Sequence, residues 1–571
     1  MAEYLIKNGH VFDPILGIKG EVHNIAIRDG KFVEPSALTS SAKTIDASGK
    51  TVMAGGVDIH SHVVGPKVNV GRLFRPEDKL FKSPLRQPKN ARMEMGFSVP
   101  STFKTGYDYS RMGYCFVNEA AMPPLHSPHV HEEIRDTPLI DNTAMPVLGN
   151  NWFMLEYLKN GEIENNAAYT AWLLHATKGF AIKVVNPGGT EAWGWGLNCV
   201  TINDPVPHFN ITPTEIIKGL IETNEYLRLP HSIHLHGNNI GNPGNYTDTI
   251  DTLKLAEGYS PNCDFGRDQV IHNTHLQFHS YGGDSWLNFE SKAKEIMEYV
   301  NRQKNLTFDL GVVTLDETTT MTADGPFEHH LQSLNHLKWA NVDVELETAA
   351  GIVPYVYGKD VKVCNIQWAI GLELALFCND PMRSHITTDH PNAGPFIRYP
   401  RIIKWLMSKA SRDELLHSFK WSEKVIGATN IESIDREMSL YEIAMMTRAG
   451  TAKALGLSHM YGSFTEGLAG NVAIYDLDPE NMPSDPEMIE KAFGRAAYTL
   501  KDGVIVVKDG DIVGDTPKST IWVNVKVPEN KQVARDVSEK FLRYYSVNKD
   551  NYSLFEEHLH NPKVIEVDIT A

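Results

Sequence analysis

Two histidines separated by one residue are the first side chains in this sequence that could do chemistry together. His60 and His62 follow an apolar run and a glycine pair within residues 52–62. In a strand, residues i and i+2 point to the same face, so the two imidazoles could bind one metal ion. The alternative is a half-buried strand whose histidines form ordinary hydrogen bonds.

A lysine and an aspartate in other apolar runs could complete such a site. Lys183 lies inside an apolar strand pattern, where burial would lower the pKa of the amine and make it nucleophilic toward carbon dioxide. Its carbamate would be an anionic ligand able to bridge two metal ions, whereas the alternative is a lysine whose amine reaches the surface. Asp389 ends another run, where it could bind a metal and accept a proton, or else cap a helix.

Two histidine-rich segments supply further candidate ligands. His236 lies in residues 232–239 and His275 in residues 271–279. Each has a competitor, because strand alternation places His234 on the face of His236, and His279 follows His275 closely. The competing histidines could instead support the ligands or lie in the core with their hydrogen bonds satisfied.

Short apolar runs with polar ends recur eight times and predict the elements that position these residues. The runs are residues 57–62, 114–118, 144–149, 180–185, 231–236, 270–275, 306–312 and 384–389. Helix-like stretches lie between several of them, for example residues 213–227 and 286–302. Strands that alternate with helices predict a parallel sheet. Eight of them predict an α/β fold of the (β/α)8 barrel type, whose site lies at the C-terminal ends of the strands.

Both ends of the chain have the pattern of a small β domain. Hairpin signals occur at Asn8-Gly9 and Asp29-Gly30, and residues 500–513 contain two Asp-Gly turns. We therefore predict that residues 1–54 and residues 441–571 together build one β-sandwich around an inserted barrel of residues 55–440. The second part also carries a predicted helix at residues 533–545 and an edge strand at residues 564–569.

Composition excludes several classes of protein. The chain has 571 residues, 42% of them hydrophobic and 22% charged, as expected for a globular protein of more than one domain. Its net charge of −17 argues against a general nucleic-acid binder. We expect no membrane span, and the N-terminal residues lack a signal-peptide pattern, which favours the cytoplasm. The five cysteines contain no Cys-x-x-Cys pair, so neither a disulfide framework nor an iron–sulfur cluster is expected.

The order His-x-His, Lys, His, His and Asp on successive predicted strands resembles the amidohydrolase superfamily, which includes dihydroorotase, hydantoinase and urease. Residues 52–62 are similar to its first-strand motif and residues 388–391 to its last-strand motif. Residues 449–457 and 467–476 resemble its usual return to the β domain. Nearly the whole chain also resembles the family of A-type subunits of formylmethanofuran dehydrogenases from methanogenic archaea. The segments that carry this resemblance are residues 57–64, 118–124, 179–189, 230–241, 271–283 and 387–395.

The resemblance implies a dinuclear zinc site. Its ligands would be His60, His62, carboxylated Lys183, His236, His275 and Asp389. In that family a partner subunit with a molybdenum or tungsten pterin reduces carbon dioxide to formate. The A-type subunit then condenses formate with the amine of methanofuran in the first step of methanogenesis from carbon dioxide. Asp389 would be the general acid and base.

The resemblance also implies partners. These are the pterin subunit, iron–sulfur subunits, and a larger electron-transfer complex with heterodisulfide reductase. Two other functions stay open at this point: a free-standing cyclic amidohydrolase of the hydantoinase or dihydroorotase type, and a barrel kept as an inactive scaffold. The first would act without partner subunits, and the second is disfavoured because every expected ligand is present.

A basic segment follows the first predicted strand. Residues 67–92 contain eight lysines and arginines against two acidic residues. Because the segment follows a strand end of the predicted barrel, we expect it near the mouth. We predict that Arg72 and Arg75 pair with anionic groups on the methanofuran tail. The alternative is a solvated loop or a subunit interface.

Overall fold

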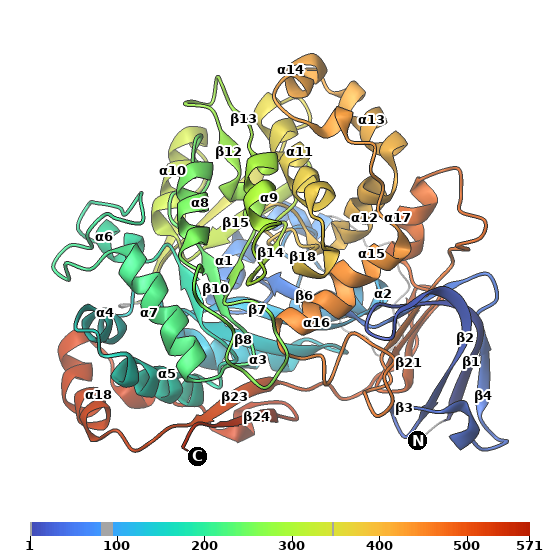
Figure 1. Cartoon of the computed structure of the whole chain (residues 1–571), viewed down its shortest axis with the longest axis horizontal. Helices are drawn as coiled ribbons and strands as arrows, with labels where there is room; N and C mark the ends of the chain where they lie inside the picture. The colour runs from blue at the N-terminus through green and yellow to red at the C-terminus, as the bar shows by residue number, and fades with distance from the viewer. Residues whose placement is uncertain (1–2, 81–94, 345–347, 571) are drawn as a thin grey trace.

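The computed structural model describes residues 3–80, 95–344 and 348–570, and parallel strands form its centre (Figure 1). Three of them pair in the order β6–β7–β8 and five in the order β9–β10–β11–β14–β18. Isolated bridges from Val147 to Lys183 and from Ser61 to His390 continue this order from β8 to β9 and from β18 back to β6. Each strand overlaps one of the eight predicted runs. Their bounds are β6 (Gly56–Ser61), β7 (Tyr114–Met122), β8 (Asp141–Pro146), β9 (Lys183–Val185), β10 (Ile233–His236), β11 (Ile271–Asn273), β14 (Leu306–Asp309) and β18 (Ser384–His385).

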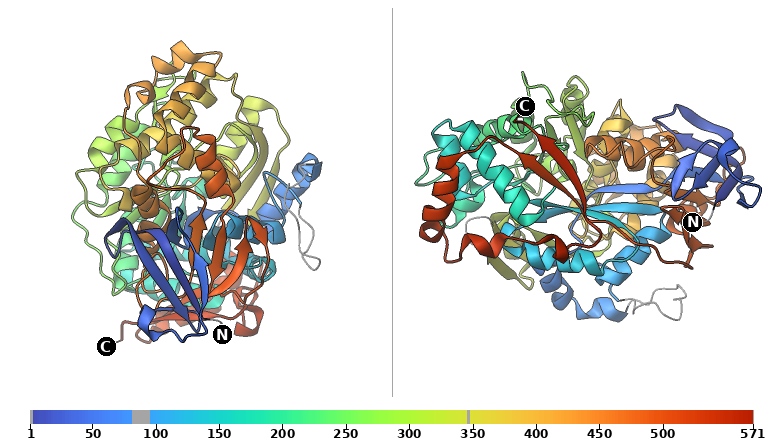
Figure 2. Two further views of the ribbon diagram at one scale, coloured as in Figure 1. Left: turned by 90° about the vertical axis from the view of Figure 1, so that its right-hand side faces the viewer. Right: turned by 90° about the horizontal axis from the view of Figure 1, so that it is seen from below.

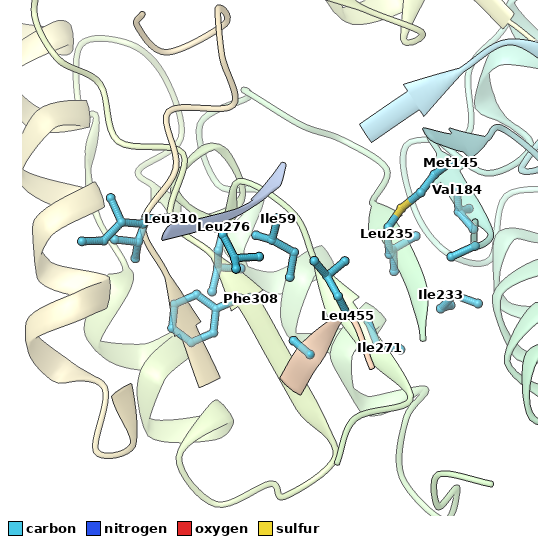
Figure 3. Packing of buried hydrophobic residues seen from close by; sticks show 14 of the residues in the cluster. Ile59, Met145, Val184, Ile233, Leu235, Ile271, Leu276, Phe308, Leu310 and Leu455 are labelled. Carbon is cyan, nitrogen blue, oxygen red and sulfur yellow. The ribbon is translucent and has the colours of Figure 1, made fainter. Parts of the chain in front are cut away.

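Apolar residues alternate with histidines along these strands. Ile59 precedes His60 in β6, and Ile233 and Leu235 flank His234 in β10. The three apolar side chains belong to one large buried cluster, part of which is drawn in Figure 3. Because alternate residues of a strand face opposite sides, packing of the apolar side chains turns the histidines toward the other face.

Helices lie between successive strands in the chain and surround them (Figure 1). The predicted helix at residues 213–227 is α7 (Pro213–Tyr226), which begins with a capping box between Thr212 and Glu215. The predicted helix at residues 286–302 is shorter than expected. There, α9 (Ala293–Val300) begins only after β13 (Glu290–Ser291) has paired with β12 (Tyr281–Gly282). The other helices of the central region are α1 (Pro66–Phe74), α2 (Thr102–Arg111), α3 (Ser127–Asp136), α4 (Trp152–Lys159), α5 (Ile163–Thr177), α6 (Gly189–Trp193), α8 (Tyr246–Lys254), α10 (Gly325–Asn335), α11 (Lys362–Phe377), α12 (Tyr399–Met407), α13 (Lys409–Ser418), α14 (Ser422–Ile426), α15 (Leu440–Ala444) and α16 (Gly450–Ala454).

A nine-stranded sheet contains strands from both ends of the chain (Figure 2). Its order is β22–β21–β20–β19–β5–β1–β2–β3, with β4 paired to β1. The antiparallel pair of β5 and β19 joins the two halves. The bounds are β1 (Tyr4–Asp13), β2 (Ile18–Arg28), β3 (Lys31–Val33), β4 (Lys43–Asp46), β5 (Thr51–Ala54), β19 (Val472–Tyr475), β20 (Tyr498–Lys501), β21 (Val504–Lys508) and β22 (Asp511–Ile512).

Three of the four predicted turns in this sheet are present. Asp29-Gly30, Asp502-Gly503 and Asp509-Gly510 each separate two antiparallel strands, with positive φ at both residues. The predicted turn at Asn8-Gly9 is wrong, because β1 runs on through it with a shift of register against β2. Asn8 has a φ of 60°. The left-handed conformation that Asn-Gly adopts readily serves a β-bulge here instead of a hairpin.

The C-terminal segment leaves the nine-stranded sheet and returns to the central region. β23 (Ile521–Lys526) and β24 (Lys563–Asp568) form a separate parallel pair, and β23 packs on α5. The predicted terminal helix is α18 (Lys531–Tyr544), which lies on the far side of the molecule from β1–β4 in Figure 1. Before it, α17 (Glu487–Gly494) contacts α12.

A small antiparallel sheet interrupts the chain between β14 and α11. It consists of β15 (Glu317–Thr322), β16 (Ala340–Val344) and β17 (Thr348–Val356), and both β15 and β17 contact α1. The sequence patterns did not predict this sheet. Among the described residues, no helix is long and apolar enough to cross a membrane.

Candidate metal centre

Three histidines from two strand ends converge on one buried carboxylate. His60 and His62 lie at the end of β6, His275 follows β11, and Asp389 follows β18. Asp389 Oδ1 lies 2.9 Å from His60 Nε2 and 3.3 Å from His62 Nε2. Asp389 Oδ2 lies 3.7 Å from His275 Nε2. The structure therefore brings four of the six predicted ligands together directly.

The Asp389 carboxylate is ionised in this setting. Burial by itself would raise its pKa, but His275 and His60 outweigh that effect and hold the pKa well below its usual range. The amide of Asn392 donates to Asp389 Oδ2 at 2.8 Å and orients the carboxylate. Oδ1 is left facing the two histidines of β6.

Two of these residues have an unusual backbone conformation. His275 has a φ of 37° and Asp389 a φ of 47°, in the left-handed region that is unfavourable for residues other than glycine. Asp309 stabilises the left-handed conformation of His275, because its Oδ1 accepts a hydrogen bond from the His275 N–H at 2.9 Å. Thr387 Oγ1 donates to the same oxygen at 2.6 Å. Such strain, held by surrounding hydrogen bonds, is typical of functional sites.

Lys183 begins β9 and is buried. Burial lowers the pKa of its amine to about 7, an effect that the carboxylates of Asp389 and Asp309 partly oppose. The uncharged amine, which is the form that attacks carbon dioxide, is therefore more populated than in an exposed lysine. The Nζ atom lies 3.5 Å from Thr274 Oγ1.

His236 and His234 lie at different depths along β10. The His236 ring centroid is 4.7 Å from that of His275, and its Nε2 lies 3.1 Å from Asp324 Oδ2. His234 is deeper, and both of its ring nitrogens contact other histidines, His60 at 2.8 Å and His231 at 3.0 Å.

The donor atoms suit a divalent metal ion. Among the described residues, the buried atoms His60 Nε2, His275 Nδ1 and Asp389 Oδ1 form no hydrogen bond of acceptable geometry, although His60 Nε2 and Asp389 Oδ1 lie 2.9 Å apart. Ligand atoms of these three residues lie within 4.8 Å of one another. A second group with the same spacing comprises His60, His234 and Asp309. Imidazole nitrogens and carboxylate oxygens are ligands for zinc and other divalent first-row metals.

Hydrogen bonds beneath β6 hold the His-x-His segment in place. Asp58 Oδ2 accepts from Tyr109 OH at 2.6 Å, from Tyr399 OH at 2.7 Å and from Ser61 Oγ at 2.8 Å. Its Oδ1 accepts from the His60 N–H at 3.0 Å. Burial raises the pKa of Asp58 to about 6, although these donors lower it.

Glu119 on β7 supports His62 in the same way. Its Oε1 lies 3.2 Å from His62 Nδ1 and 3.4 Å from Lys67 Nζ. Its Oε2 accepts from the backbone N–H groups of Val63 at 2.8 Å and Val64 at 3.1 Å. Burial acts to raise the pKa of Glu119, but Lys67 and the hydrogen bonds outweigh it and bring the pKa to about 2.

Sequence reasoning did not assign roles to several of these supporting residues. Asp309 ends β14 in the structure, but it lies in the middle of the predicted run at residues 306–312, so its position gave no signal comparable to that of Asp389. Asp324 and Asn392 lie in loops, where no periodic pattern pointed to them. Glu119 lies within β7, in a segment that only the family resemblance had marked.

Arg72 and Arg75, which were predicted to contact a ligand, have protein acceptors in the structure. Arg72 pairs with Glu133 at 3.2 Å and donates to the carbonyls of Val63 and Pro100. Arg75 is buried and donates to Thr318 O at 3.0 Å and to Glu317. The part of the predicted basic segment at residues 81–94 lies outside the described residues.

Comparison with known proteins identifies relatives over the full length. The model of the amidohydrolase family matches residues 43–507. Protein FwdA of Methanocaldococcus jannaschii is 56% identical over 573 residues, which covers 100% of this chain and 99% of that protein. The A-type subunit of the formyltransferase/hydrolase complex Fhc of Methylorubrum extorquens is 34% identical, and the match covers 91% of both chains.

A solved structure matches the whole fold. The crystal structure of the formyltransferase/hydrolase complex FhcABCD from Methylorubrum extorquens, in complex with methylofuran, contains a chain with a TM-score of 0.89 to this one. The sequences are 31% identical, and the match covers 99% of this chain and 100% of that chain.

Replacing Glu119 with alanine should lower the free energy of unfolding by about 3–5 kcal/mol. The change leaves the buried Lys67 ammonium and two backbone N–H groups without their carboxylate. Chemical denaturation of the full-length chain measures the effect. Glu132→Ala is the matched control, because that glutamate side chain on α3 is 76% exposed. Equal stabilities of the two variants would contradict the supporting role of Glu119.

Proposed function

The chain belongs to the amidohydrolase family, and on that premise we propose that it is the A-type subunit of a formylmethanofuran dehydrogenase. In this role it condenses formate with the amine of methanofuran to form N-formylmethanofuran. The main support is the match over 99% of the chain to a complex solved with methylofuran. The relative that is 34% identical is named as a component of the formyltransferase/hydrolase complex from the same organism.

We propose that residues 55–440 are a (β/α)8 barrel and that residues 1–54 and 441–571 form its companion β-sandwich with a terminal extension. The strand order that continues through the two isolated bridges supports the barrel. The pairing of β5 with β19 supports a β domain made from both chain ends. The separate pair of β23 and β24 corresponds to the extension.

The proposed metal centre holds two zinc ions between His60, His62, carboxylated Lys183, His236, His275 and Asp389. The lowered pKa of Lys183 supports the carbamate, because an uncharged amine is required for its formation. We favour His236 over His234, since both nitrogens of His234 already contact histidines. We favour His275 over His279, because His275 Nε2 faces Asp389 at 3.7 Å.

When bound, the zinc ions would supply Lewis acidity that polarises the carbonyl carbon of formate. The chain's own contribution is Asp389, whose ionised carboxylate accepts a proton from the attacking amine. The amine enters as an ammonium ion and gives up two protons, one before and one after the C–N bond forms. Asp389 returns both protons to the departing oxygen, so that the C–O bond breaks and water leaves. Asn392 keeps the second carboxylate oxygen oriented through its 2.8 Å hydrogen bond.

The reduction of carbon dioxide is assigned to a partner subunit. The five cysteines of the sequence have no spacing typical of an iron–sulfur cluster. We propose a pterin subunit with molybdenum or tungsten as the source of formate, with iron–sulfur subunits and a heterodisulfide reductase complex as the source of electrons. The proposed location of the assembly is the cytoplasm.

Metal analysis of the purified protein should find close to two zinc ions per chain, and intact-mass measurement should find a carbon dioxide adduct on Lys183. Lys183→Met should lose the adduct and at least one metal ion, because the bridging ligand is gone. Lys178→Met is the control, since that lysine lies just before β9 and packs on the ring of Trp522. A metal content in Lys183→Met equal to that of the wild type would refute the bridging carbamate.

Asp389→Asn should slow hydrolysis of N-formylmethanofuran, the reverse of the proposed reaction, by roughly 10²- to 10⁴-fold. Asparagine keeps the size of the side chain but cannot accept the proton. The rate is measured on the full-length chain with whatever subunits accompany it, and metal content is measured in parallel. Asp435→Asn, at a side chain that is 93% exposed, is the control. Unchanged hydrolysis in Asp389→Asn at full metal content would rule out the assigned base.

We also propose that Arg72 and Arg75 contact anionic groups of methanofuran. Their position on and just after α1, which follows a strand end of the proposed barrel, supports this. Arg72→Gln and Arg75→Gln should raise the KM for methanofuran several-fold and leave the metal content intact. Arg302→Gln, at an exposed position after α9, is the control. A KM that stays at the wild-type value would contradict this contact. Both arginines would then act only through their ion pairs within the chain.

A further inference from the structure

A line of hydrogen-bonded histidines leads away from the proposed metal centre. His60 Nδ1 lies 2.8 Å from His234 Nε2, and His234 Nδ1 lies 3.0 Å from His231 Nε2. His231 Nδ1 lies 2.6 Å from the carbonyl oxygen of Ala454, which ends α16. The three rings are fully buried. We call His60, His234, His231 and the Ala454 carbonyl the histidine relay.

The end of the relay determines where its protons lie. A carbonyl oxygen only accepts hydrogen bonds, so the proton of His231 must be on Nδ1. A neutral His231 then accepts at Nε2, which requires the proton of His234 on Nδ1. His234 in turn accepts at Nε2, which requires the proton of His60 on Nδ1. His60 Nε2 is left with a lone pair that faces Asp389 Oδ1 at 2.9 Å, an arrangement that a metal cation bound to both atoms would stabilise.

The rings of His231 and His234 are neutral for a simple electrostatic reason. They lie in contact with each other and with His272 in a fully buried layer. A cation there would be fully buried, and apart from the Ala454 carbonyl its immediate hydrogen-bonding neighbours would be other imidazoles. In this layer it is His272 that contacts a carboxylate, because its Nε2 lies 3.2 Å from Asp309 Oδ2.

The Ala454 carbonyl is itself held in place. Gln269 Nε2 donates to the same oxygen at 2.7 Å, and the chain turns sharply just after it at Gly456, with a φ of 71°. The relay therefore ends on a fixed acceptor and not on a mobile side chain. Its direction cannot reverse without leaving two N–H groups or two lone pairs facing each other.

We propose that His231 and His234 are positioning residues, which set the tautomer of His60 and leave its Nε2 free to bind the metal. This inference rests on the proposed metal centre. His60 Nε2 is the atom that faces Asp389 Oδ1 at 2.9 Å and forms no hydrogen bond of acceptable geometry among the described residues. A metal-bound histidine usually donates its other N–H to a carboxylate or a carbonyl. Here two neutral imidazoles connect that N–H to a backbone carbonyl.

The relay also decides between His234 as a ligand and His234 as a support. His60, His234 and Asp309 have the spacing of a metal site. In the relay, however, both nitrogens of His234 are used, one as acceptor and one as donor. Asp309 Oδ2 lies 3.6 Å from His60 Nδ1, too far for a hydrogen bond, so His234 is the acceptor for that proton.

Metal affinity tests the proposal. The variants are His231→Leu and His234→Gln, studied in the full-length protein by chelator competition, with zinc content measured per chain. His231→Leu should weaken zinc binding by roughly 10- to 100-fold, because the tautomer of His60 is no longer enforced. His234→Gln should stay within a few-fold of the wild type, because a glutamine can accept from His60 and donate to His231. His385→Leu is the matched control, since His385 stacks on His272 in the same layer but neither of its nitrogens has a hydrogen-bond partner among the described residues.

Each outcome has a distinct meaning. Weaker zinc binding in His231→Leu, with His234→Gln and His385→Leu near the wild type, supports the relay. Unchanged affinity in His231→Leu overturns it. Loss of a whole zinc ion in His234→Gln also overturns it and makes His234 a ligand. A wild-type protein without bound metal would overturn the proposed metal centre itself, which is a separate result.

A measurement on the wild type keeps the proposal falsifiable if His231→Leu does not fold. In zinc-loaded protein labelled with ¹⁵N-histidine, the ring signals that His60→Asn removes should be those of an imidazole with its proton on Nδ1 and the metal on Nε2. The Nε2–H tautomer at His60 would overturn the relay.

Discussion

A carboxylate buried among imidazoles is the constraint on which the rest of the site depends. Asp389 lies within 4 Å of three histidine nitrogens, and it is almost completely buried. An isolated buried carboxylate would take up a proton, but His275 and His60 keep the pKa of Asp389 well below its usual range. The ligand set and its charged partner are therefore stable only together.

The second layer of polar groups follows from the first. Each ligand that faces Asp389 needs its remaining atoms satisfied, because an unpaired buried polar group is costly. Glu119 contacts His62 Nδ1, and Asp309 accepts from the backbone N–H of His275. At His60, the contact is made by the histidine relay through His234 and His231. The acceptors differ, from two carboxylates to a distant backbone carbonyl. The arrangement thus holds three histidines in place through different hydrogen-bond acceptors.

The frame around the site explains why these groups meet. Parallel strands bring their C-terminal ends to one side of the fold, and alternation along each strand separates the apolar face from the histidine face. Strands as short as β9 and β18 suffice, since each has only to deliver one side chain. The left-handed residues His275 and Asp389 follow their strands and turn their side chains back toward the centre.

The sequence by itself determined the periodic and local features. Alternation predicted the eight strands, and Asp-Gly pairs predicted three turns. The order of metal-binding residue types pointed to six side chains, four of which lie together around Asp389. These signals are local, so they do not depend on distant contacts. The same local signal failed at Asn8-Gly9, where pairing with β2 and β5 decided between a bulge and a turn.

Only the tertiary structure decided between equivalent candidates. His234 and His236 share one strand face, and the difference between them is depth along the strand, set by the positions of His60 and His231. Arg72 and Arg75 acquired internal acceptors from Glu133 and Glu317, which are far away in the sequence. The burial, the ion pairs and the tautomer of a side chain depend on neighbours from many segments at once. The spacing of residues within one segment therefore cannot predict them.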